Sequence, residues 1–267
     1  MAFFESVGRN TIGGLAYVGG LARLSGRAAY FTLVGPFRGK PVRLSRAFHQ
    51  AMAVGIEALP ILSTITFFVG LILALQGAYE LRKFGALQYV AGGVAVSMSR
   101  ELGPLMTAIV VIGRSGSAFA AEIGTMKVTE ELDALTTMAL NPVQFLVTPK
   151  FLAMILMLPC LATWADFMGV MGGAVFGVTP FFGANLTLAG YIRATVDALL
   201  VRDIITGLIK SVMFGGVITA VGCYEGFETG GGAEAVGRST TSAVVMSIFL
   251  VIIVDLVFTT LFYLQGR

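Results

Sequence analysis

Long apolar tracts recur along most of this 267-residue chain, and they limit its possible folds more than any other feature. A transmembrane α-helix needs about 20 predominantly apolar residues to cross a hydrocarbon core of about 30 Å. Hydrophobic residues make up 56% of the chain and charged residues 12%, against roughly 25% charged in ordinary soluble domains. A soluble enzyme could not solvate such a surface. The sequence therefore predicts an all-α integral membrane protein.

Five of these tracts are long enough to span a membrane. They are expected at about residues 58–79, 88–118, 151–178, 204–224 and 242–263. The connection before the fourth span, residues 179–203, is expected to be a loop outside the membrane. Pro180, Gly183 and Asn185 in this connection are typical of turns. The sequence shows no internal repeat and no second soluble domain.

The segment before the first span has a different composition. Residues 3–31 mix apolar side chains with glycines and arginines, which suits an amphipathic helix lying in the membrane interface. The predicted organisation is therefore an interfacial helix and basic segment over 1–50 and a transmembrane domain over 51–267. Seven basic residues precede the first span and favour a cytoplasmic N-terminus, so five spans place the C-terminus outside. They are Arg9, Arg23, Arg27, Arg38, Lys40, Arg43 and Arg46.

Arg100 and Glu101 are adjacent opposite charges inside the second span. Each charge at a helix centre costs roughly 2.5–3.5 kcal/mol, so neither is expected to face lipid. Neighbouring residues on a helix point about 100° apart, so one can face a cavity while the other pairs elsewhere. Pro104 removes a backbone hydrogen bond and favours a kink. Two interpretations stay open: a polar element lining a substrate cavity, which we favour, and a buried ion pair that fixes helix packing.

Asp166 and Asp255 are two further acids within apolar spans. Lys210 or Arg202 could neutralise one of them. Packing or snorkelling at helix ends explains these acids as well as a proton relay does, and we favour the structural role. An ion-coupled secondary transporter that uses the intramembrane charges is the alternative function. Such folds usually carry paired repeats, which this sequence lacks.

Motifs for catalysis and metal binding are missing from the sequence. Residues 113–117 (GRSGS) resemble the nucleophile elbow of a serine hydrolase, but the fifth position is Ser117 rather than glycine. The single histidine, His49, precedes the first span, so no base is expected beside Ser115. The phosphate-loop motif GxxxxGKS/T is absent, so an ATPase that drives transport must be another polypeptide. We expect a non-enzymatic chain that binds no metal, cofactor or nucleic acid itself.

A short acidic segment separates the second and third spans. Residues 122–133 are expected to form one cytoplasmic helix with an acidic and an apolar face. Lys127 and Glu131 stand four residues apart, a spacing that stabilises helices. A solvated connecting helix and a coupling helix inserted into a partner's groove both stay open. The coupling candidates are Glu122, Lys127, Glu130, Glu131 and Asp133.

Several motifs resemble the MlaE/YrbE family of ABC-transporter permeases. The longest is GRSGSAFAAEIGTMKVTEELDAL at residues 113–135, with RELGP at 100–104 before it and Asn141-Pro142 after it. The match is extended by LQG at 75–77, IKSVMFG at 209–215 and GRSTTSAVV at 237–245. The resemblance covers nearly the whole chain after about residue 45.

The resemblance implies a homodimeric permease in the inner membrane, with the C-terminus in the periplasm. Family members move phospholipids or related lipids between the inner and outer membranes. They work with a cytoplasmic ABC ATPase, which binds ATP and magnesium, with a periplasmic MCE-domain lipid carrier and, in some systems, with a STAS-domain protein. The resemblance places Glu101, with Arg100 beside it, at the lipid cavity, and residues 122–135 on the ATPase. Further lipid-binding candidates on the cavity wall are Leu73, Gln76, Leu81 and Phe84.

Overall fold

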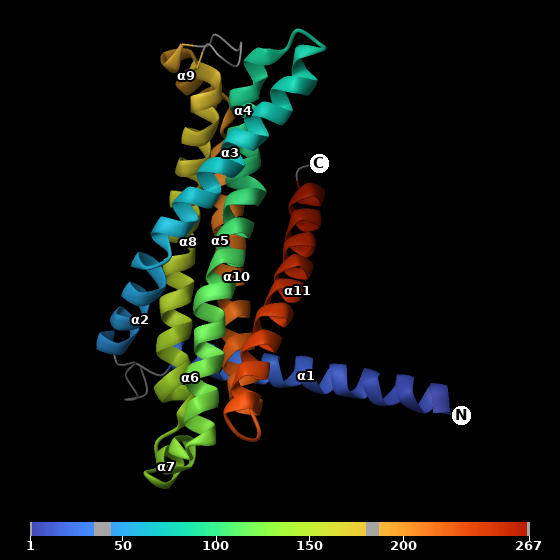
Figure 1. Cartoon of the computed structure of the whole chain (residues 1–267), viewed down its shortest axis with the longest axis vertical. Helices are drawn as coiled ribbons and strands as arrows, with labels where there is room; N and C mark the ends of the chain where they lie inside the picture. The colour runs from blue at the N-terminus through green and yellow to red at the C-terminus, as the bar shows by residue number, and fades with distance from the viewer. Residues whose placement is uncertain (1, 35–43, 180–186, 266–267) are drawn as a thin grey trace.

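The structure is a computed structural model that describes residues 2–34, 44–179 and 187–265. Over these residues it consists of helices without any strand, which confirms the all-α prediction. The elements are α1 (Ala2–Leu33), α2 (Leu44–Ile56), α3 (Leu59–Arg82), η2 (Leu87–Tyr89), α4 (Val90–Ser97), η3 (Met98–Leu102), α5 (Gly103–Val111), η4 (Ile112–Gly116), α6 (Ser117–Val128), α7 (Glu131–Thr137), η5 (Val143–Val147), α8 (Thr148–Val178), α9 (Leu188–Ala198), α10 (Val201–Glu228) and α11 (Ala233–Gln265). They form an elongated bundle with α9 at one end and α7 at the other, and we name the ends after these helices (Figure 1).

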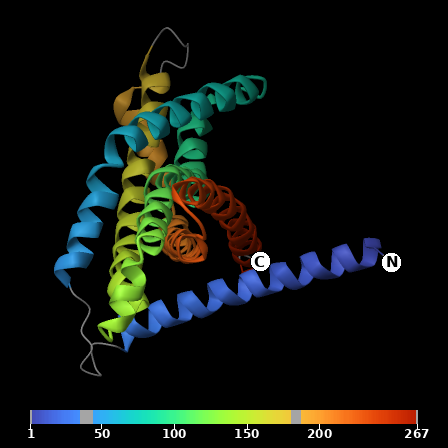
Figure 2. The same cartoon turned by 60° about the horizontal axis from the view of Figure 1, so that its bottom comes forward.

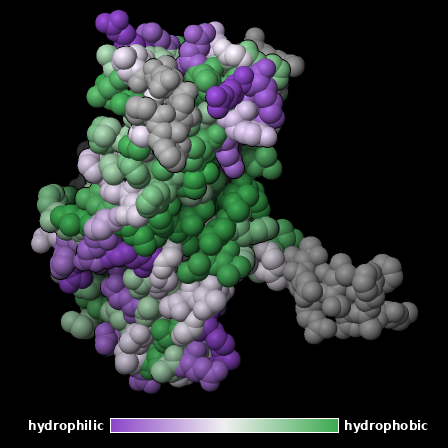
Figure 3. All heavy atoms as spheres, turned by 45° about the horizontal axis from the view of Figure 1, so that its top comes forward, coloured by the Kyte–Doolittle hydropathy of each residue, from purple (hydrophilic) through white to green (hydrophobic). Residues whose placement is uncertain are grey.

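Five helical tracts among the described residues are long and apolar enough to cross a membrane. They are Leu44–Arg82, Leu87–Val128, Val143–Val178, Val201–Glu228 and Ala233–Leu264. Each contains one predicted span and extends beyond it at one or both ends, so the predicted number and order of spans are confirmed. Hydrophobic residues cover much of the middle of the bundle, and hydrophilic residues gather towards its ends (Figure 3). A surrounding bilayer requires this distribution.

The first tract consists of two helices. Pro60 stands in the first turn of α3, where its missing N–H costs no helical hydrogen bond. At the break between α2 and α3, the Arg114 side chain pairs with Glu57 and donates to the backbone oxygen of Ala53 at 3.0 Å. α2 crosses the predicted boundary at residue 50 and packs against α8.

The second tract is a continuous run of helix with π-helical turns at η3 and η4. In η3 the backbone N–H of Gly103 donates to the carbonyl of Met98, five residues back. Pro104 follows directly, and in a regular helix its ring would crowd the carbonyl four residues before it. The irregularity predicted at Pro104 is therefore a wider turn, which holds Arg100 and Glu101. Such turns are frequent at functional sites.

α1 lies across the bundle near the α7 end (Figures 1 and 2). The helix predicted over residues 3–31 is therefore confirmed, and its crosswise position suits the membrane interface. The Tyr17 hydroxyl donates to Glu225 on α10 at 2.7 Å. Burial, with the Glu225 carboxylate adding to it, raises the pKa of Tyr17 above its usual range. Three of the basic residues used to predict the orientation lie outside the described residues: Arg38, Lys40 and Arg43.

The prediction of a loop over residues 179–203 was wrong, because this segment contains α9. Thr187 begins the helix by accepting a hydrogen bond from the N–H of Gly190 at 3.1 Å. Tyr191 is buried, and its hydroxyl donates to the backbone oxygen of Val170 on α8 at 3.3 Å. Burial raises the pKa of Tyr191 to about 12. The predicted turn residues lie outside the described residues: Pro180, Gly183 and Asn185.

The prediction of one helix over residues 122–133 was also wrong, because α6 ends and α7 begins within this range. Between the two helices Glu130 adopts a left-handed conformation with φ 61°. The Thr129 hydroxyl donates to the backbone of α6 at 3.0 Å. Short polar side chains that bond to nearby backbone compete with helix continuation. Lys127 and Glu131 consequently lie on different helices rather than on one face.

Glycines set the distance between α3 and α8. A Cβ atom at Gly70 would overlap the backbone carbonyl of Gly169, and one at Gly172 would overlap the carbonyl of Phe67. α10 approaches the second tract in the same way at Gly207. Membrane helices pack closely through small residues because lipid tails offer no hydrophobic driving force for association.

We expect Gly70→Ala to destabilise the protein by about 1–3 kcal/mol, because the added methyl group meets backbone that cannot move aside. Thermal unfolding in detergent measures the change. Gly77→Ala in the same helix is the matched control, since no atom lies within 4 Å of its Cβ position. Alanine favours a helix over glycine by about 1 kcal/mol, so the control should be neutral or stabilised. Equal effects of the two substitutions would contradict the packing argument.

Candidate functional site

A buried charged cluster joins three helices inside the bundle. The Lys210 ammonium on α10 lies 2.5 Å from Glu101 on η3 and 2.9 Å from Asp255 on α11. It also donates to the Thr259 hydroxyl at 2.7 Å, and that hydroxyl donates to Glu101 at 3.1 Å. We call Glu101, Lys210, Asp255 and Thr259 the Lys210 cluster. Lys210 was one of two cations predicted to neutralise an intramembrane acid, and this is confirmed at Asp255.

The Lys210 cluster satisfies the charge that is hardest to bury. Only 1% of the Lys210 side chain is exposed, and removing an ammonium from water costs several kcal/mol. The ammonium donates hydrogen bonds to Glu101 and Thr259, and the Asp255 carboxylate adds a second negative charge at 2.9 Å, although its Oδ1 has no hydrogen-bond partner among the described residues. Glu101 is 38% exposed and Asp255 18%, so Glu101 is the carboxylate that reaches furthest into open space.

Arg100 pairs in a different direction from Glu101, as the helical geometry allows. Its Nε lies 2.8 Å from Asp203 at the start of α10. The other carboxylate oxygen of Asp203 accepts the backbone N–H of Leu200 at 3.1 Å and so caps α10. Sequence reasoning missed Asp203 because it fell in the predicted loop. The sequence carries no capping-box signature here, because the residue three positions before Asp203 is Leu200 rather than serine or threonine.

A cavity of ≈ 300 Å³ lies beside these ion pairs, between the second tract, α10 and α11. Its lining includes Ser97, Arg100, Glu101, Lys210, Thr259 and Phe262. Both interpretations of Arg100 and Glu101 therefore describe part of the geometry, because the two side chains form ion pairs and also line a cavity. The volume lies at the lower end of the range for small-molecule sites.

The four candidates predicted on α3 and its outer turn do not line this cavity within one chain. Leu73 and Leu81 pack against the core between α3 and α4. Gln76 and Phe84 are exposed, with Phe84 at 80%. The structure therefore brings Arg100 and Glu101 together and leaves these four apart from them.

Asp166 lies apart from the Lys210 cluster. One of its carboxylate oxygens is buried and has no hydrogen-bond partner among the described residues. The carboxylate packs against Gly103, where a Cβ atom would overlap it. The glycine of the RELGP motif therefore makes room for an acid on α8.

The coupling candidates divide into two groups. Glu122 belongs to α6 and pairs with the buried Lys150 at 2.5 Å. Lys127 donates to the backbone oxygen of Phe227 on α10, so it too is tied to the bundle. The remaining three candidates are exposed around the start of α7, without an ion pair among the described residues: Glu130, Glu131 and Asp133. Leu132 between them is buried and anchors α7 to the core.

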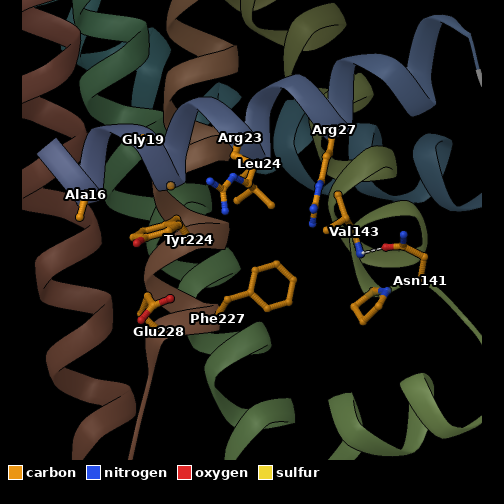
Figure 4. A pocket seen from close by; sticks show the side chains of 12 residues that line it. Ala16, Gly19, Arg23, Leu24, Arg27, Asn141, Val143, Tyr224, Phe227 and Glu228 are labelled. Atoms are coloured by element: carbon orange, nitrogen blue, oxygen red, sulfur yellow. Dashed lines mark hydrogen bonds between the residues drawn. The ribbon is translucent and has the colours of Figure 1, made fainter.

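A larger pocket of ≈ 690 Å³ lies at the α7 end, between α1, α10 and the start of the third tract. Arg23 and Arg27 project from α1 on the side where Tyr224 and Asn141 lie (Figure 4). The Asn141 side chain accepts the backbone N–H of Val143 at 3.0 Å. This pocket holds no part of the Lys210 cluster.

We expect Lys210→Met to destabilise the protein by about 3–5 kcal/mol, because two partly buried carboxylates lose their shared cation. Lys83→Met is the matched control. Lys83 pairs with Glu80 at 2.9 Å, but both side chains are more than half exposed, so its loss should cost at most about 1 kcal/mol. Thermal unfolding in detergent compares them. If Lys210→Met were no more destabilised than Lys83→Met, the cluster would have no structural role.

Known proteins match nearly the whole chain. The sequence model described as permease MlaE matches residues 47–261. A "Probable ABC transporter permease protein" of Rickettsia typhi is 39% identical over 257 residues, which is 96% of each chain. The intermembrane phospholipid transport system permease protein MlaE of Haemophilus influenzae is 33% identical over 248 residues, covering 91% of this chain and 94% of that one. This chain therefore belongs to the MlaE family of ABC transporter permeases.

Proposed function

We propose that this permease moves phospholipids between the inner and outer membranes of a double-membraned cell. The observation that carries the proposal is the cavity lined by Arg100 and Glu101 inside an apolar bundle. Charges at this depth are costly and mark transport pathways. The name of the Haemophilus influenzae relative supports a phospholipid as the substrate.

The exposed parts of the Arg100 and Glu101 side chains suit a polar lipid headgroup. Arg100 is 48% exposed and offers donors beyond the Nε that pairs with Asp203. Guanidinium groups bind phosphate through two parallel hydrogen bonds, so Arg100 is the proposed phosphate contact. Glu101 orients the rest of the headgroup. Acyl chains then bind by burial, at about 0.8 kcal/mol per CH₂.

A cavity of ≈ 300 Å³ is too small for two acyl chains, so we propose that two copies of the chain enclose a larger one. Only 11% of the apolar window in α11 is buried within one chain. Its exposed apolar residues recur three or four positions apart, the spacing of a helix-packing face: Val245, Phe249, Ile252 and Leu256. In the homodimer, the α3 candidates Leu73, Gln76, Leu81 and Phe84 belong to the wall of the shared cavity.

The α7 end is the proposed docking site of a cytoplasmic ABC ATPase, which binds ATP and magnesium. The exposed acids of α7 are the contact residues. The N-terminal helix α1 lies at this end, so the N-terminus is cytoplasmic and the C-terminus periplasmic, where an MCE-domain carrier collects the lipid. A STAS-domain protein is a further proposed partner on the cytoplasmic side. The chain itself catalyses no reaction.

The second tract is the proposed path between ATPase and substrate. One uninterrupted run of helical elements leads from α6 through η4 and α5 to Glu101 in η3. Its two π turns are the positions where the run departs from regular helix. A movement of α7 would therefore reach the cavity through α6 and these turns.

We expect Glu130→Lys with Glu131→Lys to abolish co-purification of the ATPase, because both exposed acids reverse their charge. The matched double control is Glu80→Lys with Asp197→Lys, two exposed acids near the α9 end. The control should retain the ATPase. Retention by the α7 variant would remove the proposed docking site.

We expect Glu101→Gln to lower ATP-driven transfer of labelled phospholipid between reconstituted vesicles at least tenfold, while the ATPase still co-purifies. The substitution keeps the side-chain shape but removes the charge at the cavity. Glu80→Gln serves as the control and should transfer lipid normally. Unchanged transfer by Glu101→Gln would make the residue structural. Transfer that persists without any ATPase would instead indicate an ion-coupled transporter.

A further inference from the structure

A second polar pocket lies at the α7 end, between α2 and the start of the third tract. It has a volume of ≈ 350 Å³ and is separate from the cavity beside the Lys210 cluster. Its lining includes Arg46, His49 and Gln50 from α2, Glu122 from α6, Phe145 from η5 and Lys150 from α8. We call it the α2 pocket.

One cation in the α2 pocket is buried. Only 2% of the Lys150 side chain is exposed, and its ammonium lies 2.5 Å from a Glu122 oxygen and 4.8 Å from the centre of the Phe119 ring. An ammonium removed from water needs a permanent counterion. The Glu122 carboxylate therefore balances the charge of the Lys150 ammonium. It leaves no negative charge in the pocket lining for a second cation.

A second cation in the pocket, Arg46, has no such counterion among the residues that the structure describes. The Arg46 guanidinium carbon lies 3.8 Å from the centre of the Phe145 ring, so one face of the group is stacked. No carboxylate pairs with Arg46 within the described residues. Stacking fixes the plane of a guanidinium but leaves its N–H edges free for a planar, two-point contact. Arg46, Lys150 and Glu122 together give the pocket one uncompensated positive charge, with His49 and Gln50 beside it as further hydrogen-bonding groups.

The position of α2 indicates which source of anions could balance the uncompensated positive charge of the pocket. Apolar side chains spaced four residues apart on α2 are about half to three-quarters exposed, which suits contact with lipid: Leu44, Phe48, Met52 and Ile56. α2 begins near the level of α1 along the bundle (Figure 1). α1 has the character of an interfacial helix, so the first turns of α2 lie at the depth of lipid headgroups.

We propose that the α2 pocket binds the phosphate of a phospholipid headgroup in the leaflet at the α7 end. Its single negative charge balances the pocket, and Arg46 contacts it through two N–H groups. Binding would hold α2 against α8 and against α6, the helix that carries Glu122. This site does not depend on which molecule the permease transports, because it uses none of the cavity residues near Glu101.

Amide hydrogen exchange over residues 44–56 tests the proposal at the site itself. The full chain, purified and delipidated in detergent, is titrated with short-chain phosphatidylglycerol. We expect the lipid to slow amide exchange in α2. We expect Arg46→Gln to raise the lipid concentration that gives half of this protection at least tenfold. Arg46→Lys keeps the charge but loses the two-point contact. The lipid concentration that it needs should therefore lie between those of the unaltered chain and of Arg46→Gln. Arg193→Gln, an exposed arginine on α9, is the matched control and should behave like the unaltered chain.

Inorganic phosphate at the same concentrations separates the two sources of the anion. Weak or absent protection by phosphate supports a lipid site. Equal protection by phosphate would overturn the lipid assignment in favour of a free anion. Equal protection of Arg46→Gln and the unaltered chain by the lipid would overturn the site altogether. A phospholipid transfer assay on the same variants distinguishes these results from a failure of the transport proposal, which rests on Glu101.

Discussion

The ammonium of Lys210, held between carboxylates from two other helices, is the interaction on which the arrangement of the membrane-spanning part depends. α11 packs against α10 and α6 through buried residues that all precede Asp255, so the contact of Asp255 with Lys210 ties the later part of this helix to the bundle. In a bilayer no water can replace a lost partner, and the alternative to each ion pair is an isolated charge. The same contact sets the direction of Glu101, because one of its oxygens must face Lys210. The polar wall of the cavity is therefore a consequence of the ion pair that the buried Lys210 ammonium requires.

Close packing around the second tract likewise serves both the arrangement of the helices and the cavity. Gly207 on α10 lets the helix approach the backbone of η3 at Ser99, and Gly103 leaves room for the carboxylate of Asp166. Both glycines adjoin or face the π turn that holds Arg100 and Glu101. A side chain at either position would push a helix away from this turn and disturb the ion pairs with it. The sequence motif RELGP is thus a packing motif as well as a charge motif, and the two roles cannot be changed independently.

Hydropathy was enough to predict the five spans, since each tract carries its signal locally. Local sequence also showed that Arg100 and Glu101 need not pair with each other, because neighbouring residues on a helix point about 100° apart. It could not identify Asp203 as the partner of Arg100, because that contact depends on how two distant tracts pack. The break at Glu130 escaped prediction for another reason: a left-handed residue other than glycine has no strong local signal. The helix α9 was missed because turn-forming residues just before it outweighed a short amphipathic pattern.

The position of Glu122 changes how the acidic segment is divided between roles. Sequence grouped this residue with the exposed acids of α7, but its carboxylate is needed by Lys150, whose ammonium is buried. A partner protein that drew Glu122 away would leave that ammonium uncompensated, at a cost of several kcal/mol. The proposed contacts with the ATPase therefore fall on α7, while Glu122 serves the joint between α2, α6 and α8. An anion bound at Arg46 would strengthen this joint, because it adds the negative charge that the joint lacks. The end of the bundle that faces the ATPase in the proposed complex would then respond to the lipids around it as well as to the ATPase.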